Sequence, residues 1–164
     1  MPRSLALLAC LASCAPAAPT PEAVRAAIGA ELARSTEATR AEDIDAYMDQ
    51  MPVGAVIHDE GGAVITREQQ RANILRDWAI IERTLAIEVV VDSLMLVTAD
   101  SATVHTSQRW ERLMYRRDGV TLDTVVTTQK HREAWAKTPR GWRAFEVEEL
   151  GGTVTINGTP YRPE

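Results

Sequence analysis

Apolar residues follow a helical period in the first half of the chain. They recur at every fourth position from Val24 to Leu32, which predicts a helix over residues 20–38. The same reasoning predicts a short second helix over residues 42–51. A third helix is predicted over residues 66–82, because it opens with a capping-box sequence.

In the second half the apolar period changes from 3.6 to 2, the period of a strand. Four strands are predicted there, over residues 85–91, 101–116, 119–137 and 141–151. A short hairpin over residues 54–65 is predicted before the third helix. Three of the strands far exceed the usual five or six residues, and long strands curl. The pattern predicts an α+β fold in which three N-terminal helices pack on the concave face of a strongly curved, mainly antiparallel sheet.

Length and composition fit one globular domain. The 164 residues are 45% hydrophobic and 25% charged, and a chain of this size can bury its own core. The domain is expected over residues 22–152, with a C-terminal hairpin or tail over residues 153–164 that turns at Asn157-Gly158. A net charge of −5, with no Lys/Arg run longer than two, argues against nucleic acid as a partner.

Residues 1–13 have the layout of a secretory signal. One positive charge precedes a ten-residue apolar stretch that is too short to span a bilayer. The end of the stretch resembles the bacterial lipobox, in the sequence Leu11-Ala12-Ser13-Cys14. The resemblance implies that Cys14 becomes lipidated and that residues 14–21 tether the domain in the cell envelope, on the outer-membrane or periplasmic side. An ordinary cleaved signal, followed by secretion, is the alternative.

Thiol, metal and cofactor chemistry have no visible motif. Both cysteines, Cys10 and Cys14, precede the domain, so cleavage before Cys14 leaves no thiol in it. The three histidines lack the spacing of metal ligands, and the sequence shows neither a phosphate-binding loop nor a nucleophile elbow. We therefore expect no metal and no cofactor, and we expect a membrane as partner only through the lipid anchor.

Three short stretches match the motifs of one superfamily. Residues 41–51 begin Ala-Glu-Asp-Ile-Asp, residues 55–62 read Ala-Val-Ile-His-Asp-Glu-Gly-Gly, and Trp142-Arg143 opens the last long strand. With the order of elements, they resemble the nuclear transport factor two-like cone fold, shared by SnoaL-like cyclases, ketosteroid isomerases, scytalone dehydratase and limonene epoxide hydrolase. The resemblance implies an apolar pocket at the open end of the cone. It also implies a homodimer that pairs through the convex face of the sheet.

Asp59 is the candidate general base. In ketosteroid isomerases the matching aspartate moves a proton on the substrate, and the resemblance carries this role to Asp59. Because side chains alternate along a strand, Asp59 shares the apolar face with Ile57 and is expected to point inward, with His58 outward. The alternative is structural, with the carboxylate accepting backbone hydrogen bonds in the turn before Gly61-Gly62.

A ketosteroid isomerase itself is not favoured. Ser35 stands where those enzymes carry a tyrosine, so the oxyanion of the intermediate lacks that donor. A dehydratase would instead use His105 or His131 as acid or base opposite Asp59, with a tyrosine such as Tyr47 polarising a carbonyl. For each histidine the favoured interpretation is structural, as a strand-surface residue or a core residue with its hydrogen bonds satisfied.

Ligand contacts are expected from helices and strands together, namely from Tyr47, Ile57, Trp78, Arg109 and Gln129. Arg109 shares a strand face with His105, and Gln129 shares one with His131 and Glu133. The sequence leaves open which of these faces are concave, since the opposite faces are not clearly more apolar.

The sequence favours an exported SnoaL-like domain that binds a small hydrophobic ligand or a partner through the cone pocket, without catalysis. The alternative is a cofactor-independent isomerase, dehydratase or cyclase with Asp59 as its base. Two converging titratable groups in a closed pocket would favour the enzyme, whereas a filled cone would favour an interaction domain.

Overall fold

The computed structural model describes residues 18–161, which form three helices and seven strands. In chain order these are α1 (Pro21–Arg40), α2 (Ile44–Met48), β1 (Val56–His58), β2 (Val64–Thr66), α3 (Arg67–Trp78), β3 (Ile81–Thr98), β4 (Ser101–Tyr115), β5 (Leu122–Thr138), β6 (Gly141–Ile156) and β7 (Thr159–Pro160). The predicted signal peptide and Cys14 lie outside the described residues. Of the helices described, none combines the length and the apolar character needed to cross a membrane.

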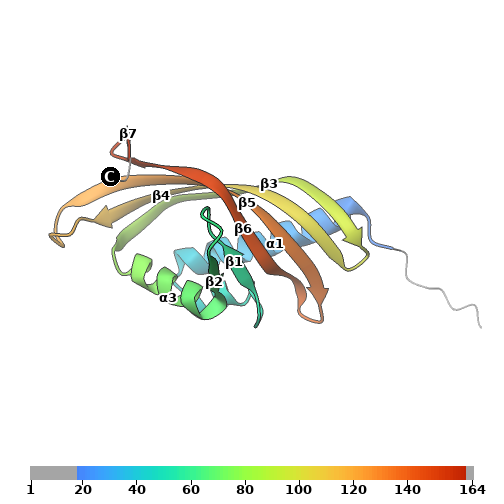
Figure 1. Ribbon diagram of the computed structural model, residues 1–164. Coiled ribbons are helices and arrows are strands. Elements are labelled where there is room, and N and C mark those ends of the chain that lie inside the picture. The colour runs from blue at the N-terminus through green and yellow to red at the C-terminus, as the bar shows by residue number, and fades with distance from the viewer. Residues whose placement is uncertain (1–17, 162–164) are drawn as a thin grey trace, which may run out of the picture.

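The strands form one sheet that arches over the helices (Figure 1). Its order is β2-β1-β6-β5-β4-β3, and β7 pairs with β6. All neighbours are antiparallel except β1 and β6, which are parallel. The helices lie on the concave side of the arch. The predicted α+β architecture is confirmed.

Bulges and a glycine shape the bend of the sheet. Two register shifts interrupt the β5–β6 pair, one on either side of the segment 131–134. Such irregularities bend a strand and increase its local twist. At Gly152 a Cβ atom would lie 2.1 Å from the carbonyl oxygen of Thr128, so glycine is what allows the two strands to approach so closely here.

Side-chain caps set where the helices begin. The Thr20 hydroxyl accepts a hydrogen bond from the backbone N–H of Ala23 at the start of α1. Thr66 and Gln69 form the predicted capping box at the start of α3, each side chain accepting from the other residue's backbone N–H.

Two helices are shorter than predicted. α2 begins later because the Asp43 side chain caps it by accepting from the N–H of Ala46, while Glu42 has a φ of 53° in the left-handed region. α3 ends before residue 82 because the chain already pairs with β4 at Ile81. Pairing in the sheet therefore overrides the helical pattern at that point.

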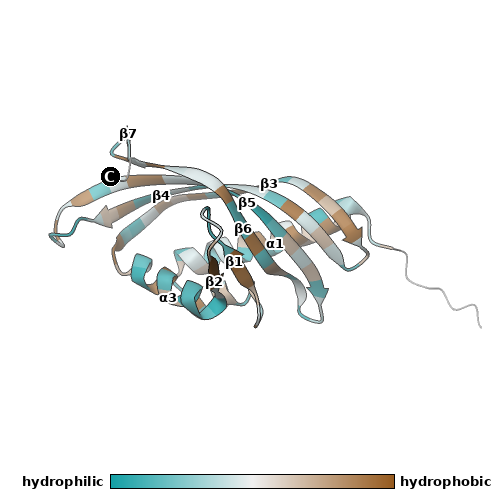
Figure 2. Ribbon diagram, in the orientation of Figure 1, coloured by the Kyte–Doolittle hydropathy of each residue, from teal (hydrophilic) through white to brown (hydrophobic). Residues whose placement is uncertain are grey.

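Two apolar clusters hold the helices on the sheet. The first packs α1 against the long strands through Val24, Ile28, Leu32, Ala102, Val104, Trp135, Trp142 and Ala144. The second joins α2, β1 and α3 through Met48, Met51, Ala55, Ile57 and Ile74. Figure 2 shows β1 and β2 as strongly apolar and α3 as mainly hydrophilic, which fits a helix that buries Ile74 and exposes its outer face.

A buried ion-pair network ties α1 and the end of α2 to β6. The Arg143 guanidinium lies 3.1 Å from Glu31 and 2.9 Å from Asp49. Arg143 and Glu31 are only 6% and 7% exposed. Because buried charges are tolerated when they are paired, the three side chains form one structural unit.

Candidate functional site

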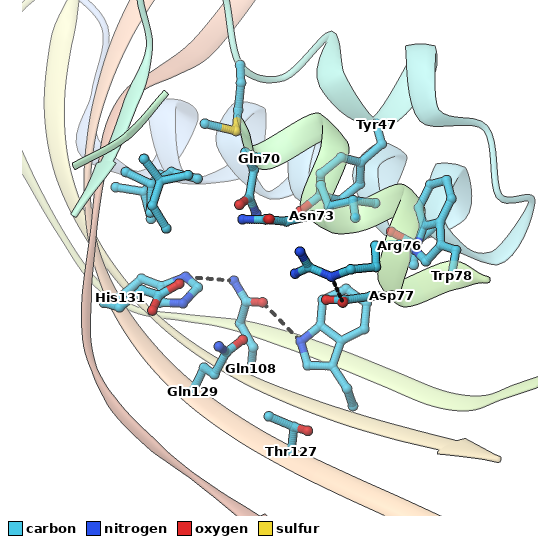
Figure 3. Close-up of a pocket in the computed structure, with 18 of the residues that line it drawn as sticks. Tyr47, Gln70, Asn73, Arg76, Asp77, Trp78, Gln108, Thr127, Gln129 and His131 are labelled. Atoms are coloured by element: carbon cyan, nitrogen blue, oxygen red, sulfur yellow. Dashed lines mark hydrogen bonds and ion pairs between the residues drawn. The ribbon is translucent and has the colours of Figure 1, made fainter. Parts of the chain in front are cut away.

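A cavity of about 500 Å³ lies between α3 and the concave face of the sheet (Figure 3). Its apolar wall includes Met51, Ile57, Ile74, Trp78, Trp110 and Val147. Its polar wall includes Tyr47, Gln108, Arg112, Gln129, His131 and Glu149. A cavity of this volume, with a few polar groups among apolar ones, has the size and character of a small-molecule site.

Strand alternation decides which side chains reach this cavity. Along β4 the even-numbered residues Gln108 and Arg112 line it, and along β5 the odd-numbered residues Gln129, His131 and Glu133 do so. The register places Gln108 directly opposite Gln129. The sequence left open which polar strand faces are concave. The concave face carries the polar residues of β5, namely Gln129, His131 and Glu133.

Five of the predicted site residues meet at the cavity: Tyr47, Ile57, Trp78, Gln129 and His131. His105 and Arg109 lie on the opposite, convex face of β4. There the His105 Nδ1 atom lies 3.1 Å from the Ser93 hydroxyl, and Arg109 pairs with Glu111 at 2.8 Å. These two residues are separated from the cavity by the sheet itself.

Asp59 lies in the turn between β1 and β2. Its Oδ1 atom accepts hydrogen bonds from the backbone N–H groups of Gly61, at 2.9 Å, and Ala63, at 2.8 Å. Asp59 is not among the residues that line the cavity. This is the turn-stabilising arrangement that stood as the alternative to an inward-pointing base. Beside it, the His58 Nε2 atom lies 3.1 Å from Glu146.

A chain of hydrogen bonds runs along the cavity wall from an indole to an imidazole (Figure 3). The Trp110 Nε1–H donates to Gln108 Oε1 at 3.1 Å. The Gln108 Nε2 atom lies 3.1 Å from His131 Nδ1. The His131 ring is thus held by Gln108, whose amide Trp110 orients, rather than by a carboxylate.

Glu133 is a buried carboxylate near His131 on the same strand. It is only 2% exposed, yet both of its oxygens are occupied. Oε1 accepts from the Thr106 hydroxyl at 2.8 Å, and Oε2 accepts from Trp135 Nε1–H at 2.7 Å. The His131 Nδ1 atom lies 3.8 Å from Oε1, which is beyond hydrogen-bond distance.

Glu149 lies beside His131 across the β5–β6 pair, where the two residues are register partners. Burial raises the pKa of the Glu149 carboxyl, His131 acts in the opposite direction, and the carboxylates of Glu60 and Asp59 raise it further. Directly opposed residues of antiparallel strands have Cβ atoms about 4.5–5.5 Å apart. Two titratable groups therefore converge on one wall of the cavity.

The cavity lining also carries a cation and a phenol. The Arg112 guanidinium stacks over the Trp110 ring, with its Cζ atom 4.5 Å from the ring centroid. Burial lowers the pKa of Arg112, while Asp77 and Tyr47 act in the opposite direction. Burial also raises the pKa of Tyr47, whose ring meets Trp78 edge-on at 6.1 Å between centroids. Arg112 remains the positive end of the cavity, and Tyr47 remains a neutral hydroxyl.

Three buried polar atoms of the cavity residues have no hydrogen-bond partner within the described part of the chain. They are Gln50 Oε1, Arg112 Nε and His131 Nε2. Buried polar groups in folded proteins are nearly always satisfied, and an exception needs an explanation. The three residues that carry these atoms all line the same cavity.

The sequence did not single out Gln108, Arg112 or Glu149. Alternation from Trp142 alone assigns residues 144, 146 and 148 to the inner face and leaves Glu149 on the outer face. The shift in the β5–β6 register beside Trp135 moves the inner face to odd-numbered positions and brings Glu149 to the cavity. A bulge has no simple signal in one sequence.

Within residues 18–161, the structure contains no group of three His, Cys, Asp or Glu side chains able to hold a metal ion. Neither a protein-family model nor a curated protein matches the chain.

Similar solved structures do exist. One is a candidate scytalone dehydratase from Novosphingobium aromaticivorans, at 10% identity and a TM-score of 0.69, over 85% of this chain and 88% of the other. A second is an NTF2-like protein from Cytophaga hutchinsonii, at 12% identity and a TM-score of 0.60, over 77% and 97% of the two chains. A third is a hexachlorocyclohexane dehydrochlorinase, LinA type 2, at 13% identity and a TM-score of 0.62, over 86% and 90%. The chain therefore has the nuclear transport factor two-like cone fold that its sequence resembles.

Proposed function

We propose that this protein binds a small carbonyl-containing molecule in the cavity and catalyses proton transfer on it without a cofactor. In this proposal Glu149 is the general base, and His131 with Arg112 contacts the substrate oxygen. The juxtaposition of Glu149 and His131, in a cavity whose buried polar atoms lack partners, supports it.

The chemistry follows from the placement of charge. Glu149 removes a proton from the carbon next to the carbonyl, and the electrons of the C–H bond shift toward the carbonyl oxygen. A carboxyl whose pKa is raised is a stronger base toward such a proton. Arg112 and His131 stabilise the negative charge that grows on the oxygen. Returning the proton to another carbon gives isomerisation, and giving it to a departing hydroxide gives dehydration.

The similar structures support this class of reaction by analogy. Two of them have names that denote eliminations, a dehydratase and a dehydrochlorinase. Identities of 10% and 13% carry the fold alone, so the roles of Glu149 and His131 rest on the cavity of this chain. The base proposed from the sequence, Asp59, is replaced here by Glu149, which Asp59 influences through its charge.

Hydrogen–deuterium exchange of a simple enone tests the proposal. With 2-cyclohexenone in D₂O, followed by proton NMR, the wild type should accelerate exchange next to the carbonyl. Glu149→Gln should slow the catalysed exchange by about 100-fold, since a positioned base contributes on the order of 10²–10⁴. Glu146→Gln is the matched control, because Glu146 lies on the same strand with its side chain 53% exposed, next to His58. It should keep the wild-type rate.

Binding without catalysis is the second candidate, and it is the function that the sequence favours. The partnerless atoms of Gln50, Arg112 and His131 support a polar ligand whether or not it reacts. Titration with 2-naphthol, an enolate mimic, separates the two. Shifts of cavity resonances without any exchange activity would indicate a binding domain, and the absence of both would overturn the proposed site.

We also propose that the domain works in the cell envelope, held there by a lipid on Cys14. This rests on the lipobox-like sequence Leu11-Ala12-Ser13-Cys14.

A further inference from the structure

The hydrogen-bond chain Trp110–Gln108–His131 indicates which nitrogen of the neutral His131 ring carries the proton. An indole N–H can only donate, so its partner in Gln108 is the amide oxygen. The amide NH₂ group then faces His131, and an NH₂ group also only donates. His131 Nδ1, at 3.1 Å, must therefore accept. A neutral imidazole with an accepting Nδ1 carries its proton on Nε2.

No other neighbour competes for the Nδ1 position. Glu133 is the nearest carboxylate, but its Oε1 atom is 3.8 Å away and both oxygens already accept from Thr106 and Trp135. The Trp110 ring is itself held by the guanidinium of Arg112 above its face. The Trp110 indole N–H therefore determines the orientation of the Gln108 amide, because this N–H can donate a hydrogen bond but cannot accept one.

The opposite nitrogen of the His131 ring has no partner within the described part of the chain. This atom, Nε2, is buried and belongs to a residue that lines the cavity. Its neighbour across the strands, Glu149, is the carboxyl that can accept a proton. The two groups therefore offer a substrate different functions, a donor N–H and an accepting carboxylate.

Building on the proposed function, we infer that Trp110 and Gln108 lock neutral His131 as the Nε2–H tautomer, so that His131 donates a hydrogen bond to a ligand oxygen and Glu149 alone takes the proton. Gln108 and Trp110 are positioning residues in this scheme. The ligand class is a compound with an oxygen acceptor, such as a ketone or an enone, placed about two bonds from an acidic C–H. When that C–H bond breaks, the proton goes to Glu149 and the electrons reach the oxygen held by His131.

Nitrogen-15 NMR of the labelled, ligand-free protein tests the tautomer directly, at a pH where imidazoles are neutral. The two ring nitrogens of His131 give well separated signals when one is protonated and the other is not. The wild type should show Nε2 protonated. A wild-type ring with the proton on Nδ1, or an equal mixture, overturns the inference.

Gln108→Glu is the informative variant because it keeps the shape and removes the donor. One carboxylate oxygen can still accept from Trp110, and the other now accepts from His131, so the proton should move to Nδ1. Gln129→Glu is the matched control. Gln129 is the register partner of Gln108, and this substitution adds the same negative charge to the same cavity. It should leave the proton on Nε2. An unchanged tautomer in Gln108→Glu contradicts the lock.

Trp110→Phe gives a second route if Gln108→Glu does not fold. Without the indole N–H, both orientations of the Gln108 amide become available, and the two tautomers of His131 should mix. Exchange of 2-cyclohexenone should slow by about tenfold in Gln108→Glu, because a lone pair on Nε2 would face the ketone oxygen. A locked tautomer without any exchange defeats only the proposed catalysis, whereas exchange with the proton on Nδ1 defeats only the inference about His131.

Discussion

Asp59 affects the site from a distance. Its Oδ1 atom holds the β1–β2 turn through two backbone N–H groups, and its charge raises the pKa of Glu149. The residue types in this segment matched a superfamily motif, and the match led to Asp59 as the base. The structure shows how a carboxylate at that position can serve a turn and a neighbouring carboxyl at once.

Substitution separates these two effects of Asp59. Asp59→Ala should destabilise the domain by about 0.5–2 kcal/mol, because two N–H groups of the turn lose their acceptor. Asp59→Asn keeps an oxygen in place and should keep most of the stability, yet it should lower the pKa of Glu149 by removing a like charge. Urea unfolding and a carbon-13 NMR titration of Glu149 measure the two quantities. Equal destabilisation in both variants, with Glu149 unchanged, would contradict this division.

Glu149 should also leave a signature in the pH dependence of stability. Its pKa is raised above the ordinary value of 4.5, so the folded protein holds this proton more tightly than the unfolded chain does. The contribution is complete below the ordinary pKa and is lost as pH rises through the folded value. Glu149→Gln should therefore be more stable than the wild type near about pH 7 and should lose that advantage near about pH 4. Urea unfolding at the two pH values checks the sign, and a constant difference would contradict it.

At the scale of elements, local chemistry predicted the helices well. Thr20 and the Thr66–Gln69 capping box satisfy the first N–H groups of α1 and α3, and such caps act over a few residues that are adjacent in sequence. The helix ends were less predictable. The end of α3 depends on Ile81 pairing with β4, a contact between distant parts of the chain.

The loop between β4 and β5 sets the pairing register of these long strands. The alternation of apolar and polar residues does not predict that register. A turn centred on Asp118 would pair Gln108 with residue 128, whereas Gln108 pairs with Gln129. The loop between β4 and β5 is one residue longer than such a turn, because it is closed by the Arg116 N–H, which donates to the carbonyl of Thr121 at 2.8 Å. A register error of one residue turns every side chain to the wrong face. The sequence left the concave face open because neither face of these strands is clearly more apolar, and the register of the predicted turn does not decide between them.

The ion-pair network gives a test at this scale. Arg143→Met should destabilise the domain by about 3 kcal/mol, because the buried Glu31 carboxylate would lose its buried partner and keep only Arg34, whose side chain is 64% exposed. Arg140→Met is the control, since Arg140 also pairs with Asp49 but its side chain is 73% exposed. It should cost less than about 1 kcal/mol. Urea unfolding compares the two, and similar losses would show that burial is not the deciding factor.

At the scale of the whole molecule, stability and ligand binding occupy different parts of the cone. The first apolar cluster and the Arg143 network hold α1 on the sheet with paired groups and closely packed side chains. The cavity under α3 is bounded by polar atoms that lack partners. Of the four buried side-chain atoms without a hydrogen-bond partner in the described residues, three belong to cavity residues and the fourth is Glu148 Oε2, and such a concentration is typical of a site that a ligand completes.

Localisation is tested through Cys14. If the lipobox-like sequence is processed, the expressed protein should fractionate with membranes and carry a lipid on its first mature residue. Cys14→Ala should block this maturation, because the thiol is the acceptor of the lipid. Membrane fractionation and mass spectrometry provide the readout, with Cys10→Ala as the matched control that should mature normally. A soluble mature protein that begins after Cys14 would overturn the proposal.

The convex face of the sheet leads to a prediction about assembly. Val90, Met95 and Leu150 are 55%, 63% and 49% exposed. Val90 and Met95 lie on the convex face because their β4 partners are Ser107 and Thr103, and Val90 and Leu150 line a shallow hollow there. Apolar side chains gathered on one sheet face are typical of an interface, and a twofold dimer would cover them.

Sedimentation at micromolar concentration should therefore give twice the mass of one chain. Val90→Glu should shift the protein toward monomer, because each interface would bury two like charges close to the twofold axis. Val53→Glu is the matched control: Val53 is 85% exposed in the loop before β1, away from this face, and the variant should remain dimeric. A wild-type protein that sediments as a single chain would show that the exposed valine, methionine and leucine face solvent.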